Sequence, residues 1–219
     1  MLENKNILIT GCSGGIGHAL VECCLDEGAR VFAHTRTLTN EWDSNENVIP
    51  ICFDMRDSKE MKEEINKIRK GYKKIDILIN NAGTLSENKL FQMTSKEEMY
   101  NVFDVNFFAT MELTQLVSRI MNKNGSIVNV ASIVAIDGNP AQLEYSASKA
   151  AIICATKKLA MEFARMGIRV NAVAPGLTNT NMLNKMNSEE EKKLLDRMVL
   201  KRRADPSEIA KAIVFLASD

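Results

Sequence analysis

The sequence predicts an α/β fold in which helices cover both faces of a doubly wound parallel sheet. Short, continuously apolar runs alternate with longer segments of helical period, in the order βαβαβ, along the 219 residues. Apolar runs without polar alternation are typical of parallel strands that are buried on both faces. Since no Pro-, Gly- or Ser-rich linker interrupts the alternation, we expect a single domain over residues 1–219.

The elements of this fold can be assigned in chain order. Strands are expected at Asn6–Thr10, Arg30–His34, Val48–Phe53, Ile75–Asn80, Ser126–Ala131 and Arg169–Ala174. Crossover helices are expected between them, at Ile16–Glu27, Ser58–Lys70, Ser95–Asn122 and Gln142–Met166. In such sheets ligands bind beyond the carboxyl ends of the strands, where the strand order reverses. We therefore expect the residues that directly follow strands to gather at one edge of the sheet.

Composition and charge exclude several classes of protein. Hydrophobic residues make up 45% and charged residues 26%, which is the balance of a folded globular domain and not of a disordered chain. Lys plus Arg and Asp plus Glu both number 28, so no net charge attracts nucleic acid or an anionic membrane. No apolar stretch approaches the roughly 18 residues of a membrane span, and no signal peptide is recognisable. These features predict a soluble, cytoplasmic protein.

The cysteines and histidines do not have the spacing of a metal site. The five cysteines are odd in number and form no CxxC pair, so we expect reduced thiols at Cys12, Cys23, Cys24, Cys52 and Cys154. The only histidines are His18 and His34. We therefore expect no bound metal.

A glycine-rich turn directly follows the first expected strand, in the run Thr10-Gly11-Cys12-Ser13-Gly14-Gly15-Ile16-Gly17. Glycines permit positive φ and let backbone N–H groups and the helix N-terminus approach a pyrophosphate closely. Such turns also occur where they only join a strand to a helix. The position on the first strand-to-helix connection favours a dinucleotide site.

The spacing T-G-x-x-x-G-x-G resembles that of the short-chain dehydrogenase/reductase family, whose members share a Rossmann-type fold. The resemblance implies that Gly11, Gly15 and Gly17 line the cofactor phosphates, with Ser13 and Ile16 nearby.

The residues after the second expected strand bear on the choice of cofactor. That strand is followed by Thr35-Arg36, without the acid that binds the ribose 2′-hydroxyl of NAD. Arg36 can pair with a 2′-phosphate, which favours NADP(H) over NAD(H), although Arg36 also fits a solvated surface charge. Many NADP-preferring relatives carry a basic residue where Gly14 stands here, so one expected feature of an NADP site is missing.

Three further segments follow strands and resemble cofactor-binding motifs of the same family. Asp54-Met55 stands where an acidic dipeptide position contacts the adenine ring. Residues Asn80, Asn81, Ala82 and Gly83 match the family's N-N-A-G signature, and Pro175, Gly176 and Thr178 match a segment that cradles the nicotinamide amide and the phosphates. Taken alone, these residues would equally suit turns and strand ends.

The chemical residues are expected on a helix and at the end of a strand. Tyr145 and Lys149 are four residues apart in a helical segment, so their side chains share one face. A nearby ammonium favours the phenolate, so we expect Lys149 to lower the pKa of Tyr145 and let it exchange a proton near neutral pH. Ser132 ends the fifth expected strand, where its hydroxyl can hydrogen-bond a carbonyl oxygen.

Together Ser132, Tyr145 and Lys149 resemble the family's catalytic triad, and Asn106 matches its fourth member. The resemblance implies that Tyr145 is the acid or base, that Ser132 polarises the carbonyl and that Lys149 binds the nicotinamide ribose while tuning Tyr145. It also implies that Asn106 holds a water in a proton relay, although Asn106 alone would equally suit a residue that satisfies helix backbone.

The amino-acid sequences of two segments indicate a class of substrate. Gly138-Asn139-Pro140-Ala141-Gln142 and the closing run Val214–Asp219 look most like 3-oxoacyl-acyl-carrier-protein reductases, but also occur in sugar, polyol and secondary-metabolite dehydrogenases. A rival reading is a non-catalytic, dinucleotide-binding regulatory protein. An acidic carrier protein would need a basic patch near the mouth of the site, for which Lys123, Arg165 and Arg169 are candidates. A homodimer or homotetramer formed through the two long helices is expected, as in relatives.

The last part of the chain is expected to cover the substrate. The resemblance implies a mobile helical lid over about residues 179–203, with Met182, Leu183 and Met186 facing the substrate. Family members usually continue past Leu-Ala-Ser-Asp into a seventh strand, which this chain lacks. We therefore expect an edge strand that exposes hydrogen-bonding groups.

Overall fold

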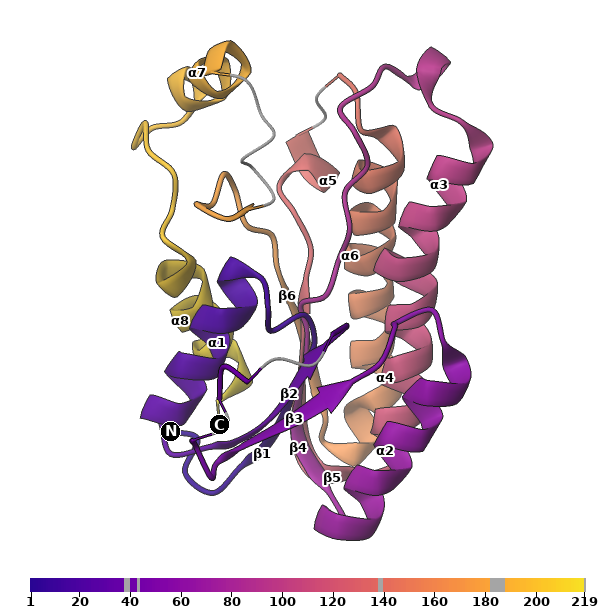
Figure 1. Ribbon diagram of the computed structural model, residues 1–219, viewed down its shortest axis with the longest axis vertical. Helices are drawn as coiled ribbons and strands as arrows, with labels where there is room; N and C mark the ends of the chain where they lie inside the picture. The colour runs from indigo at the N-terminus through magenta and orange to yellow at the C-terminus, as the bar shows by residue number, and fades with distance from the viewer. Residues whose placement is uncertain (38–39, 43, 138–139, 182–187, 219) are drawn as a thin grey trace.

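A computed structural model describes residues 1–37, 40–42, 44–137, 140–181 and 188–218, without the side chains of residues 188–190. The doubly wound parallel sheet is confirmed (Figure 1). The described residues form six strands in the order β3-β2-β1-β4-β5-β6, and every neighbouring pair is parallel. The strands are β1 Asn6–Ile9, β2 Arg30–Thr35, β3 Val48–Cys52, β4 Ile75–Asn80, β5 Met121–Val130 and β6 Arg169–Val173. The strand order reverses between β1 and β4, which places the ligand-binding crevice there.

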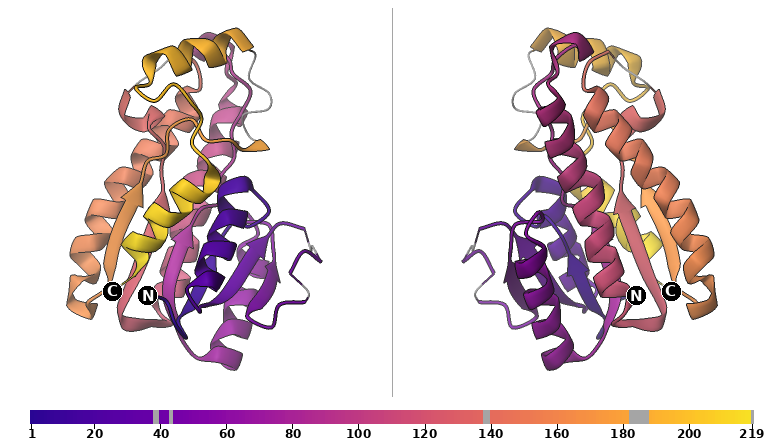
Figure 2. Two further views of the ribbon diagram at one scale, coloured as in Figure 1. Left: turned by 90° about the vertical axis from the view of Figure 1, so that its left-hand side faces the viewer. Right: turned by 90° about the vertical axis from the view of Figure 1, so that its right-hand side faces the viewer.

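Two hydrophobic layers hold the helices to the sheet. The side views of Figure 2 show helices on both faces of the sheet. Successive strand residues point to opposite faces, so Ile7 and Ile9 of β1 belong to one layer and Leu8 to the other. One face is covered by α1 (Gly15–Asp26) and α8 (Pro206–Ala217), and the other by α2 (Ser58–Tyr72), α4 (Thr110–Ser118) and α6 (Leu143–Phe163). The shorter helices α3 (Lys96–Phe103), α5 (Val134–Asp137) and α7 (Ser188–Arg197) lie toward the carboxyl ends of the strands.

The prediction of one helix over Ser95–Asn122 is wrong in two respects. A π-helical turn over Asp104–Ala109 separates α3 from α4, and the helical path ends at Ser118. Strand β5 begins at Met121, and its register against β4 shifts between Ile75 and Ile77. Gly125 makes this irregular start feasible, since a Cβ atom there would lie 2.7 Å from the Asp76 carbonyl oxygen.

Helix α8 was not among the predicted elements, although the sequence carries its signals. Asp205 and Glu208 form a capping box, and Pro206 occupies the first turn. Its buried side chains pack on α1 in the same hydrophobic layer. At its other end, the Arg169 guanidinium donates to the backbone carbonyls of Leu216, Ala217 and Ser218 at 2.8, 3.3 and 2.7 Å.

Among the described residues, no helix is long and apolar enough to cross a membrane. Within the same residues, no three His, Cys, Asp or Glu side chains are grouped as metal ligands would be.

Candidate active site

The glycine turn between β1 and α1 has the close contacts that a phosphate-binding loop needs. Gly11 has φ of +72°, and a Cβ atom there would lie 2.9 Å from the Ala82 Cα atom. A Cβ atom at Gly17 would overlap the Gly11 carbonyl oxygen. No side chain caps the N-terminus of α1, whose N-cap is Gly14. The first N–H groups of α1 and its positive dipole end are therefore open to an anion.

The turn after β4 is hydrogen-bonded to the glycine turn. The Thr10 hydroxyl oxygen accepts the N–H groups of Asn81 at 3.0 Å and Ala82 at 2.9 Å. In return, the Asn81 side-chain amide donates to the carbonyls of Thr10 at 2.9 Å and Gly11 at 3.1 Å. The two predicted cofactor segments thus form one rigid cradle at the reversal of strand order.

Asn80, the first residue of the N-N-A-G run, faces the protein interior. It is 4% exposed, and its amide donates to the Thr114 hydroxyl at 3.0 Å and to the Asn129 side-chain oxygen at 2.8 Å. Asn129 in turn donates to Thr156 of α6 at 2.9 Å. This network ties β4, β5, α4 and α6 together beneath the site.

His34 is a structural part of the site that the sequence analysis did not identify. Its ring is buried, its Nδ1 atom accepts the Gly11 N–H at 3.3 Å, and its Nε2 atom lies 3.0 Å from the Phe53 carbonyl oxygen. Since a backbone N–H can only donate, these contacts require a neutral ring with its proton on Nε2. Burial lowers the pKa of His34, which favours the same neutral form.

The predicted adenosine-binding residues lie at the ends of β2 and β3. Arg36 is exposed, whereas Met55 is buried in the hydrophobic layer beneath α2. Both oxygens of the Asp54 carboxylate accept hydrogen bonds from Arg56. Arg56 belongs to none of the predicted cofactor motifs. Hydrogen bonding to Arg56, more than any other cause, holds the pKa of Asp54 at about 2.

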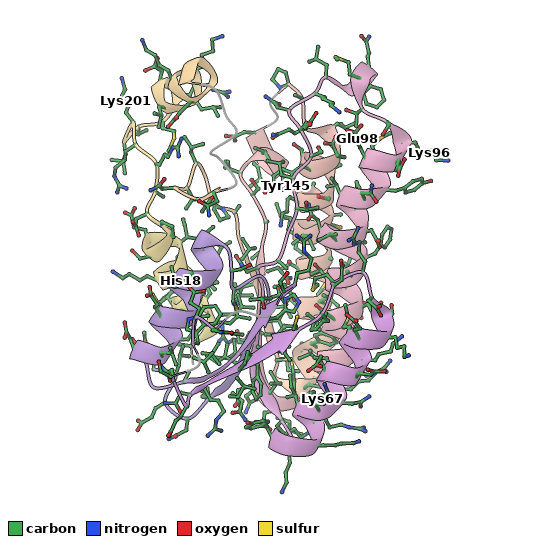
Figure 3. All side chains as sticks on the ribbon, viewed as in Figure 1. His18, Lys67, Lys96, Glu98, Tyr145 and Lys201 are labelled. Carbon is green, nitrogen blue, oxygen red and sulfur yellow. The ribbon has the colours of Figure 1, made fainter. Side chains whose placement is uncertain are left out.

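The four predicted catalytic residues converge beyond β5. The Lys149 ammonium lies 5.9 Å from the centre of the Tyr145 ring and donates to the Val130 carbonyl at 2.8 Å. Ser132 lies close enough to Tyr145 to lower the pKa of its phenol. Gly83 leaves room for the ammonium, since a Cβ atom there would lie 3.3 Å from Lys149 Nζ and 3.4 Å from Asn106 Oδ1. In Figure 3 Tyr145 lies toward the same end of the molecule as Lys201, and Lys67 of α2 lies toward the opposite end.

The electrostatics of this pair differ from the prediction. Burial raises the pKa of Tyr145, and the Ser132 side chain opposes the rise only in part. The expected net lowering of the pKa of Tyr145 is therefore wrong for the protein alone, where burial is the largest cause of the shift. Burial also lowers the pKa of Lys149 to about 8, because the residue is only 4% exposed and little water reaches its ammonium.

Asn106 lies in the π-helical turn and is 1% exposed. Its side-chain oxygen accepts the Thr84 N–H at 2.7 Å, and its amide donates to the Thr84 carbonyl at 3.0 Å and the Ser148 hydroxyl at 3.1 Å. Ser148 stands between Tyr145 and Lys149 on α6, and its hydroxyl donates to the Tyr145 carbonyl at 2.8 Å. The side chain of Asn106 therefore couples the loop after Gly83 to the helix that carries the reactive pair.

The segment after β6 crosses toward the glycine turn. Pro175 is buried, its carbonyl accepts the Ile133 N–H at 3.0 Å, and Gly176 is exposed. Thr178 pairs with Ala204 in an isolated parallel bridge, and its hydroxyl donates to the Gly176 carbonyl at 3.1 Å. Helix α7 lies within the segment expected to form a lid, and the lid role itself stays a prediction. Outside the described residues lie Met182, Leu183, Met186, Gly138, Asn139 and Asp219.

The three candidate carrier-docking residues lie away from the mouth of the site in this chain. Lys123 and Arg169 belong to the amino-terminal parts of β5 and β6, and Arg165 lies just beyond the end of α6. Ser132 and Pro175 follow the opposite, carboxyl ends of the same two strands. The guanidinium of Arg169 is also engaged by the carbonyls at the end of α8. The prediction of a basic patch near the mouth at these residues is therefore wrong for a single chain.

Comparisons with known proteins agree with this geometry. A family model described as "short chain dehydrogenase" matches residues 5–191. The chain is 41% identical to the 3-oxoacyl-[acyl-carrier-protein] reductase FabG of Thermotoga maritima, over 100% of the chain and 92% of the relative. It is 34% identical to a 3alpha-hydroxysteroid dehydrogenase of Mediterraneibacter gnavus, with the same coverage of each protein.

Solved structures show the same fold. One described as "ElxO with NADP Bound" superposes with a TM-score of 0.90 at 30% identity, covering 99% of this chain and 92% of that chain. A short-chain dehydrogenase/reductase described as glucose/ribitol dehydrogenase, from Brucella melitensis, superposes with a TM-score of 0.92 at 27% identity, covering 99% and 90%.

Proposed function

Because the chain belongs to the short-chain dehydrogenase family, we propose that it is a reductase that interconverts a ketone and a secondary alcohol, with a 3-oxoacyl thioester as its substrate. Membership makes it an NAD(P)-dependent oxidoreductase that acts on CH–OH groups. The observation that carries the proposal is the convergence of Ser132, Tyr145 and Lys149, with Asn106 behind them, beyond the carboxyl end of β5.

NADP(H) is the cofactor, and the residues at the sheet edge fit it. Gly11 and Gly17 let the backbone segments of the cradle approach more closely than Cβ atoms would permit, and the uncapped N-terminus of α1 offers N–H groups to a pyrophosphate. Arg36, exposed at the end of β2, is placed to pair with the 2′-phosphate. When bound, the nicotinamide supplies or accepts the hydride.

The protein's part in the reaction is to position the carbonyl and to supply the proton. Burial keeps Tyr145 in its phenol form, so its hydroxyl can donate a proton to the carbonyl oxygen during reduction. Ser132 hydrogen-bonds the same oxygen and orients it. Below a pH of about 8 Lys149 is charged, and its ammonium stabilises the phenolate that remains after proton transfer. Asn106 and Ser148 hold α6 in the orientation that these contacts need.

The preference for a thioester rests on the relatives. Several 3-oxoacyl-[acyl-carrier-protein] reductases, at 35–41% identity, cover nearly the whole chain. A hydroxysteroid dehydrogenase at 34% identity supports a second candidate, a secondary alcohol on a larger apolar skeleton. Sugar, polyol and secondary-metabolite substrates, and a purely regulatory dinucleotide-binding role, complete the alternatives.

The test is a fluorescence titration of the purified chain with NADPH, followed by an acetoacetyl thioester in the same cuvette. We expect tight binding and then oxidation of the cofactor. Binding followed by turnover of a 3-oxosteroid but not of the thioester would favour the second candidate. Binding without turnover across a broad carbonyl panel would support the regulatory role, and failure to bind either NADPH or NADH would contradict the proposal as a whole.

We further propose that the chain acts as one catalytic domain in a cytoplasmic homo-oligomer. Helices α3 and α6 lie side by side, and together with the π-helical turn they expose large apolar side chains. The exposed side chains are Tyr100, Phe108, Leu143 and Met161, with 47–74% exposure. Apolar groups gathered on adjoining helices support a second copy as the partner on this face. Light scattering on the eluting protein tests it, and a monomeric mass would contradict it.

A further inference from the structure

Three charged residues gather at the ends of β2 and β3. The Arg56 guanidinium binds Asp54 through two parallel hydrogen bonds, Nε to Oδ1 at 3.0 Å and Nη2 to Oδ2 at 2.8 Å. The Arg56 backbone N–H also donates to Oδ1, at 2.9 Å. Because both carboxylate oxygens are occupied in a fixed fork, this pair is better ordered than a single-point surface contact.

Arg36 lies beside this pair. The backbones of the two strand ends are joined where the Phe53 N–H donates to the Thr35 carbonyl at 3.3 Å and the Cys52 thiol donates to the Arg36 carbonyl at 3.4 Å. The charge of Arg36 acts on Asp54 and adds to the lowering of its pKa. Arg36 is exposed, so a ligand at this edge of the sheet can reach it.

An acid in this position works against a phosphorylated nucleotide. The 2′-phosphate is attached to the ribose that bears the adenine, so an Asp54 placed against the adenine adds a second negative charge at the same end of the nucleotide. The Asp54 carboxylate and the 2′-phosphate would repel each other, and both would compete for the Arg36 guanidinium. Arg56 removes both problems by engaging the carboxylate itself.

We propose that Arg56 is a specificity-determining residue for NADPH, which neutralises Asp54 and leaves Arg36 to bind the 2′-phosphate. The inference rests on the proposed function, since it takes Arg36 as the phosphate ligand. Asp104, in the π-helical turn, is the other acid whose charge acts on Arg56. Arg56 therefore interacts with acidic groups on two separate segments, the loop after β3 and the π-helical turn.

The test measures dissociation constants for NADPH and NADH on the full chain and on Arg56→Gln, Asp54→Asn and the double variant. We expect Arg56→Gln to weaken NADPH binding by about twofold to fivefold and NADH binding by less than about 1.5-fold, since exposed charge interactions contribute up to about 1 kcal/mol. Adding Asp54→Asn should restore NADPH binding, because the neutral amide no longer repels the phosphate. Asn also retains a carbonyl oxygen that can accept a hydrogen bond from adenine.

Lys62→Gln is the matched control. Lys62 pairs with Glu112 at 3.1 Å, and the exposure of that pair, 52% and 30%, is close to the 46% and 32% of Arg56 and Asp54. Lys62→Gln also removes one positive charge, from α2, which begins two residues after Arg56. It should leave the ratio of the NADPH and NADH dissociation constants unchanged. The inference alone would be overturned if Arg56→Gln left the ratio of the two dissociation constants unchanged. It would also be overturned if NADPH binding did not recover in the double variant. An unaltered chain that binds neither nucleotide would overturn the proposed function as well.

Discussion

Tyr145 is the residue on which the proposed chemistry depends. Replacing it with Phe removes the hydroxyl that gives the proton, while the ring keeps its packing and Lys149 keeps its bond to Val130. We expect turnover to fall by at least about a hundredfold, the usual contribution of general acid catalysis, with the NADPH dissociation constant changed by less than about threefold. Steady-state rates and a binding titration measure the two effects. Retention of turnover in Tyr145→Phe would refute the assignment.

The pKa of Lys149 predicts a basic limit to activity. As the pH rises through about 8 the ammonium loses its proton, and the charge that stabilises the phenolate disappears. Since the pKa of Tyr145 is raised, the tyrosine still carries its proton in this range. The rate of reduction should therefore fall above a pH of about 8, and a pH–rate profile at saturating substrate measures it. In Lys149→Arg this limb should move beyond pH 10, because a guanidinium does not deprotonate there.

For individual residues, the sequence motifs predicted which side chains come together but not how burial shifts their pKa values. Tyr145 and Lys149 share a helix face by spacing alone, and Ser132 follows a strand that ends beside them. The sign of the Tyr145 shift depends on how much water the folded protein excludes, which spacing does not show. The inward direction of Asn80 and the neutral ring of His34 likewise depend on partners from other strands, Asn129 and Phe53.

The end of α8 gives a prediction on stability at the scale of whole elements. The Arg169 guanidinium satisfies three backbone carbonyls that have no partner within the helix. Arg169→Ala should lower the free energy of unfolding by about 1–3 kcal/mol, as urea denaturation can measure. Arg165→Ala, at a nearby exposed arginine, should cost less than about 0.5 kcal/mol. Equal costs for the two variants would refute the capping role.

The segment around α7 gives a prediction on substrate binding. Arg203 pairs with Glu191 of α7 at 2.6 Å, beside the bridge between Thr178 and Ala204. Glu191→Gln should loosen α7 and raise the KM for the carbonyl substrate about twofold to fivefold, since one partly exposed ion pair is lost. NADPH binding should be unchanged. Lys192→Gln alters the adjacent charge and serves as the control, and a larger effect on NADPH than on substrate would contradict a lid role.

Helix and strand boundaries were harder to predict than their order. The six strands and the helices α1, α2 and α6 follow from apolar period, because each buries a continuous stripe. The break between α3 and α4 does not interrupt that period, so a single helix was expected there. The early start of β5 depends on the fit of Gly125 against Asp76, which is a contact between strands and leaves no local pattern.

At the scale of the whole molecule, cofactor and fold should stabilise each other. The cradle is made from the ends of β1 and β4, and the adenosine end from β2 and β3, so a bound nucleotide contacts most of the sheet edge. At NADPH concentrations about 100-fold above the dissociation constant, binding should add about 2.7 kcal/mol to the stability. The Tm should therefore rise by several degrees with NADPH and by less with NADH. A scan with equal shifts for both nucleotides would contradict the preference for the phosphorylated form.

The pairing of α1 with α8 has a consequence for synthesis on the ribosome. Helix α1 rests against α8, and their shared hydrophobic layer also includes Leu2. During translation α1 is made long before α8, so the side of the sheet that both helices cover stays partly exposed in the interval. The growing polypeptide therefore carries an apolar surface until α8 has been made, and we expect chaperones that bind such surfaces to engage it during that interval.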